Sequence, residues 1–405
     1  MSETPVKIYP QDRMTAAERL QAAVRLDKPD RVPLSLMLYY FAPLWAGVKM
    51  SLYMTRPDIY MDVMHRVWAG LGPWDIYYNI NPVSRIIYSY VIMMRILWPG
   101  LELEENAMAK IEEFAYMDQE DYDRILSRNS LFSDFLFRLD MLPRFCREAQ
   151  GLKPLKLTLK LIREYLQQLL FCHRDFSWWR RQGAVVQIGY QAEMPFDTMS
   201  QARNVINFSK DLFKCPDKIG KAAEKLANSF ANLAILTARL TGVPLVQCYC
   251  HRTSNSFISP VQFEKLAFPS MEIIVNRIVD AGMTPILHCD GNWLKNLKVM
   301  RRLPARRIIL QLDGLTDIFR AKEEIGDHMC LFGDVSAGRL VTGSPGEIEE
   351  YCHRLIEEVG KGGGFILAGG CEIPPNARFE NLKAMVRSVR KYGYYQKEQG
   401  ITFQG

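Results

Sequence analysis

Strand–helix alternation dominates the sequence from about residue 184 to residue 391. Short apolar runs alternate with longer segments of helical period. The runs predict strands at 184–189, 244–250, 284–288, 307–312, 329–333 and 364–368. The segments between them predict helices at 216–240, 260–281, 293–302, 316–325, 345–359 and 377–391. Such alternation requires parallel strands joined by helical crossovers.

A closed barrel fits this alternation better than a doubly wound sheet. The sequence contains no GxGxxG motif and no GxxxxGK motif followed by Ser or Thr, so a nucleotide-binding sheet has no motif to support it. A length of 405 residues suits one large domain. We therefore predict an α/β fold, a (β/α)8 TIM barrel, as a single domain over residues 1–405.

The N-terminal part is less regular. Thr15 and Glu18 form a capping-box pattern that predicts a helix, and residues 32–38 read as a short buried strand. Residues 40–183 are rich in Tyr, Met, Trp and Phe and have irregular helical patterning. We expect this region to be an elaborated helical lid over the barrel mouth. Its aromatic residues either line an apolar pocket or pack in the core.

The positive charge is concentrated in one segment. The net charge is +6, and residues 142–183 contain nine basic and three acidic side chains, which accounts for the whole excess. A globally basic nucleic-acid binder is therefore excluded, whereas a local docking surface fits. Leu152, Leu155, Leu159 and Ile162 form an apolar stripe interleaved with Lys and Arg. A peripheral membrane contact is one use for such a face, and a solvated helix is the alternative.

Cysteine usage and the polar N-terminus point to the cytoplasm. The nine cysteines include no CxxC pair, which argues against a disulfide scaffold and a zinc ribbon. The opening residues carry no apolar stretch typical of a signal peptide. No apolar run reaches the length of about 20 residues needed to span a membrane.

Polar side chains follow almost every predicted strand. His251, His288, Asp290 and Asp313 come after three of the strands, and Cys371 with Glu372 comes after the last. Asp334 follows the run Cys330–Gly333, and Glu193 lies after the strand at 184–189. In a (β/α)8 barrel, the carboxyl ends of the strands carry the functional residues. We expect these side chains to face one another.

His288, Asp290 and Cys371 form a candidate zinc site. One imidazole, one carboxylate and one thiolate leave the fourth position of a tetrahedral ion open, as catalytic zinc requires. Alternation along an extended chain places residues 288 and 290 on one side and Cys289 on the other. The alternative is a buried, hydrogen-bonded histidine beside a small core cysteine.

Other residues at the strand ends each have two alternative roles, one functional and one structural. Asp313, Asp334 and Glu193 are candidates to orient ligands or to act as acids or bases, although the two aspartates also suit turns or helix caps. Cys248 and Cys250 with His251 are a second possible ligand cluster, and buried structural cysteines are the alternative.

Several motifs resemble the uroporphyrinogen decarboxylase superfamily. The resemblance covers about residues 10–38 and 184–392. It is carried by Met14-Thr15, Asp30-Arg31-Val32-Pro33, Pro195-Phe196-Asp197, Asp313-Gly314-Leu315-Thr316-Asp317, Gly333-Asp334-Val335 and Ile373-Pro374-Pro375-Asn376-Ala377. This resemblance implies a (β/α)8 barrel and two main activities.

The two branches of the superfamily differ at the site. The decarboxylases use an arginine-rich loop after the first strand to hold substrate carboxylates, and residues 32–48 contain no Arg or Lys. The second branch, zinc-dependent methyltransferases that act with a corrinoid protein, has His-x-Cys after one strand and a further Cys after the last. This chain matches at His288 and Cys371 and departs at Asp290. Zinc accepts a carboxylate in place of a thiolate.

The resemblance therefore implies a corrinoid-dependent methyltransferase. It would move a methyl group between cobalamin cobalt, held on a partner protein, and a small apolar compound such as a methoxyaromatic, with zinc as Lewis acid. The basic segment 142–183 is a candidate docking site for an acidic corrinoid protein. One alternative is a metal-independent decarboxylase of a non-porphyrin acid, and another is a non-catalytic corrinoid- or tetrapyrrole-binding protein.

Overall fold

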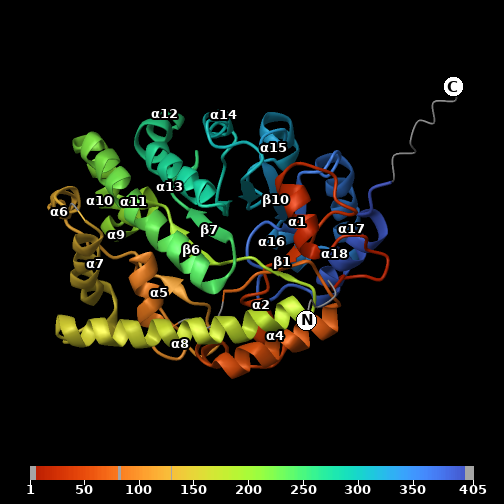
Figure 1. The fold of residues 1–405 in the computed structure, drawn as a ribbon, viewed down its shortest axis with the longest axis horizontal. Coiled ribbons are helices and arrows are strands. Elements are labelled where there is room, and N and C mark those ends of the chain that lie inside the picture. Colours follow the sequence, from red (N-terminus) through yellow and green to blue (C-terminus); the bar gives the residue numbers. More distant parts are fainter. Residues whose placement is uncertain (1–5, 81–83, 129, 397–405) are drawn as a thin grey trace.

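The computed structural model describes residues 6–80, 84–128 and 130–396. Its main sheet has six parallel strands, which are adjacent in chain order (Figure 1). They are β6 (Tyr190–Glu193), β7 (Leu245–Cys250), β8 (Thr284–Cys289), β9 (Ile309–Leu312), β10 (Cys330–Val335) and β11 (Phe365–Gly369). These strands are almost entirely buried, as expected for parallel strands with helices between them. The signal-peptide expectation rests partly on residues 1–5, which lie outside the described ranges.

A second parallel sheet joins the first at both of its edges. It contains β1 (Ser35–Leu36), β2 (Ile76–Tyr77) and β5 (Val185–Val186). Leu34, just before β1, forms a parallel bridge with Leu367 of β11. At the other edge β5 leads directly into β6, and Gly189 N–H donates to the carbonyl of Leu245. The two sheets are thus linked through β11 and β1 and through β5 and β6.

Hydrogen-bonded polar side chains cross the interior between the two sheets. Ser35 Oγ donates to Gln187 Oε1 at 3.0 Å, and Gln187 Nε2 donates to Gln247 Oε1 at 3.1 Å. Gln247 Nε2 then donates to Gln311 Oε1 at 2.8 Å. All four residues are fully buried. Because a buried amide needs partners, this chain of bonds fixes the relative positions of β1, β5, β7 and β9.

Most predicted helices of the regular region are confirmed. The structure has α9 (Pro195–Arg203), α10 (Val205–Lys214), α11 (Pro216–Thr241), α12 (Pro260–Gln262), a π-turn at Phe263–Ala267, α13 (Phe268–Asp280), α14 (Leu297–Met300), α15 (Ile318–Ile325), α16 (Ala337–Thr342), α17 (Pro345–Arg354), a second π-turn at Leu355–Val359 and α18 (Phe379–Tyr392). The positive φ of Gly242 ends α11 where the sequence indicated.

Two predicted elements were wrong in detail. The helix expected at 293–302 shrinks to the four residues of α14, because side chains capture the backbone N–H groups before it: Trp293 N–H donates to Thr316 Oγ1 and Lys295 N–H to Asn255 Oδ1. The strand expected at 184–189 is divided into β5 and β6, which pair with different neighbours.

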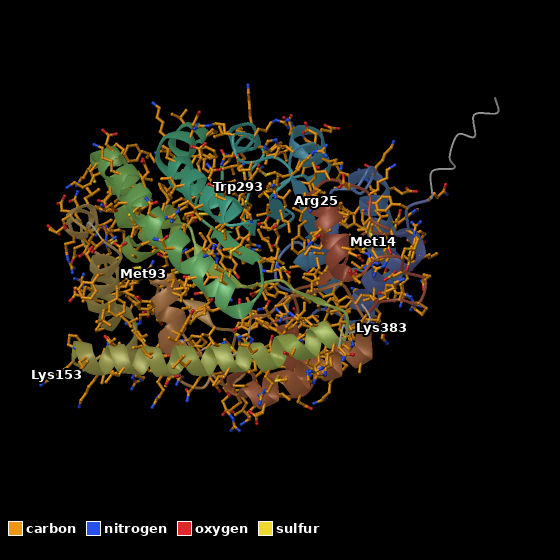
Figure 2. The ribbon with its side chains drawn as sticks, viewed as in Figure 1. Met14, Arg25, Met93, Lys153, Trp293 and Lys383 are labelled. Atoms are coloured by element: carbon orange, nitrogen blue, oxygen red, sulfur yellow. The ribbon has the colours of Figure 1, made fainter. Side chains whose placement is uncertain are left out.

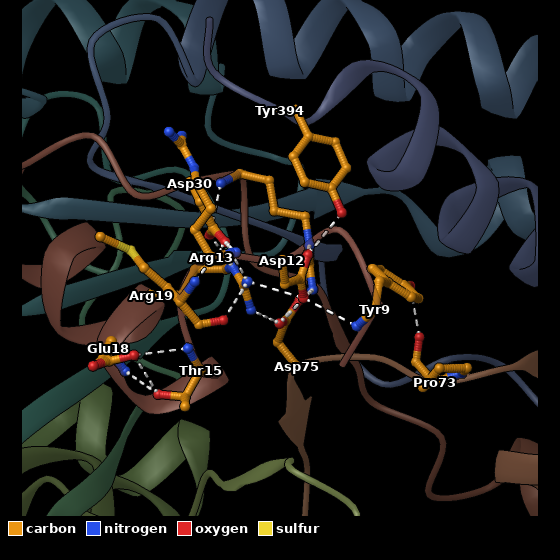
Figure 3. Close-up of polar contacts among 12 residues, drawn as sticks. Tyr9, Asp12, Arg13, Thr15, Glu18, Arg19, Asp30, Pro73, Asp75 and Tyr394 are labelled. Atoms are coloured by element: carbon orange, nitrogen blue, oxygen red, sulfur yellow. Dashed lines mark hydrogen bonds and ion pairs between the residues drawn. The ribbon is translucent and has the colours of Figure 1, made fainter. Parts of the chain in front are cut away.

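The N-terminal region contains several helices and, besides β1 and β2, a short hairpin. Its elements are α1 (Ala16–Val24), α2 (Phe41–Trp45), α3 (Met50–Thr55), α4 (Pro57–Leu71), α5 (Arg85–Ile92), the hairpin of β3 (Ile96–Leu97) and β4 (Lys110–Ile111), α6 (Asp121–Leu126), α7 (Leu131–Phe145), a 3-10 turn at Arg147–Ala149 and α8 (Pro154–Arg181). The predicted capping box starts α1, with Thr15 N–H donating to Glu18 Oε2 at 2.8 Å (Figure 3). Strand β2 was not predicted, because two residues give no periodic signal. None of the described helices has both the length and the apolarity to cross a bilayer.

A buried ion network ties the amino ends of β1 and β2 to the N-terminal arm (Figure 3). Arg19 contacts Asp30 at 2.8 Å and Asp75 at 2.6 Å. Arg31 contacts Asp12 at 2.9 Å and Asp75 at 2.6 Å. These guanidinium and carboxylate groups are almost completely buried, so each charge depends on its partners for compensation. The network lies at the end of the strands opposite to the candidate site.

Candidate functional site

Alternation at the end of β8 places His288 and Asp290 side by side, as predicted. His288 Nε2 lies 3.2 Å from Asp290 Oδ1. Cys289 is fully buried and pairs in register with Cys250 of β7. Cys371 reaches the same point from the end of β11, with its Sγ 3.7 Å from His288 Nε2. One ligand atom from each of His288, Asp290 and Cys371 lies within 4.8 Å of the others.

These separations fit a zinc ion. Tetrahedral coordination at the usual zinc–ligand lengths separates two ligand atoms by about 3.3–3.6 Å. The His288–Asp290 and His288–Cys371 distances of 3.2 and 3.7 Å bracket that range. His288 is buried, whereas the Asp290 side chain is 31% exposed, so the cluster is open on one side. Three nitrogen, oxygen and sulfur donors with one open position are compatible with a catalytic zinc.

His251 extends this cluster into a chain of four side chains. It follows β7, its Nδ1 lies 2.5 Å from Asp290 Oδ2, and its Nε2 lies 3.2 Å from Glu193 Oε1 at the end of β6. Burial alone would lower the pKa of His251, but the carboxylates of Glu193 and Asp290 outweigh burial and raise that pKa well above its usual value. The order Glu193, His251, Asp290, His288 therefore alternates acids and bases.

The same contacts shift the pKa of the other two members. Burial favours protonation of Asp290, yet hydrogen bonds from His251 and His288 hold the pKa of Asp290 far below its usual range. Burial opposes the charge on His288, while hydrogen bonds with Asp290 and Cys371 raise the pKa of His288 well above normal. Asp290 is thus a carboxylate held between two histidines, ready to accept a positive charge.

Asp313 and Asp334 lie outside this chain of contacts. Asp313 Oδ2 accepts the N–H of Gly291 at 2.7 Å and its Oδ1 accepts the N–H of Leu315 at 2.9 Å. It therefore braces the loop that follows Asp290. Asp334 Oδ1 accepts the hydroxyl of Tyr351 on the outer helix α17 at 2.8 Å. Burial raises the pKa of Asp334 to about 6.

The alternative ligand cluster of Cys248, Cys250 and His251 does not form. Tyr249 stacks on His251 and meets His288 edge-on, so residues 249, 251 and 288 share one side. Strand alternation places Cys248 and Cys250 on the opposite side, where both are fully buried. Burial raises the pKa of both thiols, as expected for core cysteines.

Glu372 and Tyr78 belong to the site and were not among the predicted catalytic residues. Tyr78 lies one residue beyond β2, and its hydroxyl donates to Glu372 Oε1 at 3.3 Å. The hydroxyl of Tyr249 lies 3.4 Å from that of Tyr78. Burial raises the pKa of Glu372 to about 7. The position of Glu372 beside Cys371 was a usable signal, whereas Tyr78 followed a strand too short to detect.

The aromatic residues of the N-terminal region divide between site and core. Tyr39 and Tyr40, which follow β1, are close enough to Glu372 for its charge to raise their pKa, although burial is the larger cause. Tyr77 stacks on Trp179 instead, and Trp45 stacks on Phe379. The expected aromatic wall is therefore made of tyrosines, with hydroxyl groups at the site.

One buried acid supports the segment behind His251. Asp197, in the first turn of α9, accepts the backbone N–H of Arg252 at 2.5 Å. Burial raises the pKa of Asp197 to about 7. Sequence reasoning had noted this residue only within a motif. Its contact holds the chain just after the histidine that links Glu193 to Asp290.

Comparison with known proteins places this site in a family. The family model described as uroporphyrinogen decarboxylase (URO-D) matches residues 179–392, which include β6 to β11 and every residue of the acid–base chain. The chain belongs to the uroporphyrinogen decarboxylase family.

Curated relatives of the family carry two kinds of name. The uroporphyrinogen decarboxylase of Coxiella burnetii (strain Dugway 5J108-111) is 29% identical over 194 residues, 46% of this chain and 51% of the relative. The methylcobamide:CoM methyltransferase MtbA of Methanosarcina acetivorans is 26% identical over 132 residues, 33% of this chain and 37% of the relative. The matched region spans about half or less of the length of these relatives.

A solved structure resembles nearly the whole chain. The methyltransferase from Methanosarcina mazei superposes with a TM-score of 0.66 at 17% identity, covering 94% of this chain and 99% of the other. At this identity the likeness shows the fold, a parallel α/β architecture of the uroporphyrinogen decarboxylase type.

Proposed function

We propose that this protein is a corrinoid-dependent methyltransferase with a zinc site formed by His288, Asp290 and Cys371. The observation that carries the proposal is the convergence of three different ligand atoms within 4.8 Å at the carboxyl ends of β8 and β11. The two linked sheets have nine strands, and because β5 leads directly into β6 they supply eight strand positions. We infer that they close into one (β/α)8 barrel over residues 1–405, with residues 40–183 as its helical elaboration.

Each residue of the site then has a distinct role. A zinc ion bound there would polarise the heteroatom that carries or receives the methyl group. His251 would orient Asp290 through its 2.5 Å contact, and Glu193 would orient His251 in turn. Asp313 would hold the loop after Asp290 in place. Tyr78 and Glu372 would pass a proton at the substrate heteroatom.

The lining of the site favours an aromatic ether over an acid. Tyrosine rings supply apolar area together with hydroxyl donors, which suits a methoxyaromatic body with a polar oxygen. Transfer of its methyl group to a cobalt(I) corrinoid on a partner protein leaves a phenolate, which takes up one proton. Residues 32–48, which include β1 and the segment after it, contain no Arg or Lys to hold a substrate carboxylate.

Experiments can distinguish two alternative functions from the proposed methyl transfer. A metal-independent decarboxylase would release CO2 from a non-porphyrin acid without corrinoid. A non-catalytic corrinoid- or tetrapyrrole-binding protein would bind its ligand at one-to-one ratio and transfer nothing. The absence of Arg and Lys from residues 32–48 disfavours the first, and the open acid–base cluster disfavours the second.

A methyl-transfer assay tests the proposal. The protein, loaded with zinc, is mixed with reduced cobalamin and a panel of methoxyaromatics, and methylation is followed by visible absorbance. We expect transfer with at least one compound and its loss in Cys371→Ala. Cys215→Ala removes another incompletely buried thiol and should retain activity. Transfer that survives in Cys371→Ala, or CO2 release without corrinoid, would contradict the proposal.

A further inference from the structure

Helix α8 presents an apolar stripe to solvent over much of its length. The exposed fractions are 72% for Leu155, 59% for Leu159, 52% for Ile162, 55% for Leu166 and 72% for Leu170. The spacing of four, three, four and four residues keeps these side chains on one face of a helix with 3.6 residues per turn. The opposite face of α8 packs on α5, α7, α11 and β5. An apolar face of this size turned to solvent marks an interaction surface.

A row of basic side chains runs beside the stripe. Lys156, Arg163, Arg174 and Arg181 are all exposed, and their spacing of 7, 11 and 7 residues places them on one flank. The acids of α8 offset only Arg163 among these four residues. Asp175 is fully buried, and Glu164, with 21% of its side chain exposed, pairs with Arg163 at 2.8 Å. The outer face of α8 therefore combines aliphatic and positive character without a free carboxylate among its described residues.

The position of α8 suits contact with a flat surface. Its 28 residues span about 42 Å at 1.5 Å per residue. In Figure 1 the helix runs along one edge of the molecule, and in Figure 2 the labelled Lys153 marks its free N-terminal end with side chains projecting outward. The stripe thus runs along one continuous helix at an edge of the molecule.

We propose that α8 docks the protein on an anionic membrane surface. A bilayer accepts an aliphatic ridge about 5–10 Å deep at the boundary of headgroups and acyl chains, and its negative charge attracts the adjacent basic row. A protein interface instead concentrates aromatic residues, Met and Arg at its centre, which this Leu and Ile stripe lacks. The proposal does not depend on the metal site.

Vesicle flotation tests the docking surface. The full chain is mixed with vesicles of phosphatidylcholine alone or with about 30% phosphatidylglycerol, at about 0.1 M and about 1 M salt, which shortens the screening length about threefold. We expect binding to the anionic vesicles at low salt, weak binding to the neutral ones and release at high salt. Failure to float with anionic vesicles at low salt would overturn the proposal.

Matched variants separate the stripe from the charge. The triple change Leu159→Gln, Ile162→Gln and Leu166→Gln should weaken binding at least about tenfold, because each removes an apolar anchor. Leu236→Gln on α11, where Leu236 is 55% exposed, should leave binding unchanged. Lys156→Glu with Arg181→Glu should also weaken anionic binding about tenfold, while exposed Lys221→Glu with Lys298→Glu should not.

Two controls keep the test decisive. The altered Leu159, Ile162 and Leu166 side chains are each more than half exposed. Thermal melting should therefore give each variant the same melting temperature as the parent. Analytical ultracentrifugation reports self-association. A dimer that dissociates in the leucine variant, together with no vesicle binding, would assign the stripe to a second copy of the chain and overturn the membrane assignment.

Discussion

His251 Nδ1 lies 2.5 Å from Asp290 Oδ2, and the opposite nitrogen of the same ring lies 3.2 Å from Glu193 Oε1. One histidine therefore connects the ends of β6, β7 and β8. Asp290 uses its other oxygen toward His288 at 3.2 Å. The proposed metal ligand Asp290 is thus positioned by a residue that is not itself in the ligand set.

His251→Ala should weaken zinc binding about 10–100-fold, because partners of metal ligands fix ligand orientation. The dissociation constant is measured by competition with a chromophoric chelator. His353→Ala on α17, where the side chain is 39% exposed, is the control and should not change the constant. An unchanged constant in His251→Ala would remove the positioning role.

Glu193→Gln and Asp334→Asn should behave differently. Glu193→Gln weakens the contact that orients His251 and should lower zinc affinity and methyl transfer together. Asp334 contacts Tyr351 on the outer helix, so Asp334→Asn should keep both within about twofold of the parent. A larger loss of transfer in Asp334→Asn, with zinc retained, would instead support Asp334 as an acid or base of the reaction.

Asp175 should make stability depend on pH. Burial raises its pKa to about 7 from the ordinary value of 3.8, so the folded state holds the proton more tightly than the unfolded chain. Its contribution is most favourable below about pH 4 and is lost as pH rises through about 7. Between pH 5 and 8 this removes about 3 kcal/mol. Urea unfolding should show that difference between parent and Asp175→Asn, and equal pH profiles would contradict it.

Arg31→Met should destabilise the protein by about 3–5 kcal/mol, because it leaves Asp12 and Asp75 buried without one of their partners. Arg301→Met breaks the Arg301–Asp327 pair, whose side chains are 39% and 69% exposed, and should cost at most about 1 kcal/mol. Urea unfolding of both variants gives the comparison. Similar losses in the two would mean that the buried network is not needed for stability.

The sequence was sufficient for the regular half of the fold and for the convergence of the three candidate ligands. Proline at position 216 and glycine at position 242 marked α11 correctly. Functional residues gather at the carboxyl ends of parallel strands, and this rule predicted that His288, Asp290 and Cys371 would lie close together. Strand alternation excluded Cys289 from the same set. These inferences needed only local periodicity and the common direction of parallel strands.

The remainder depended on contacts that periodicity does not encode. Tyr78 could not be placed because β2 has only two residues, and its partner Glu372 is nearly three hundred positions away. The role of His251 depends on side-chain direction across three strands. Strand alternation correctly excluded Cys289 from the candidate zinc site. The same alternation separates Cys250 from His251, so it also argued against the candidate cluster of Cys248, Cys250 and His251.

Metal content tests the central claim most directly. Elemental analysis of the purified protein, reconstituted under reducing conditions, should give close to one zinc per chain. Asp290→Ala and Cys371→Ala should each lose most of it, while the controls Asp327→Ala and Cys215→Ala keep it. No zinc in the parent, or full zinc in both ligand variants, would contradict a site formed by His288, Asp290 and Cys371.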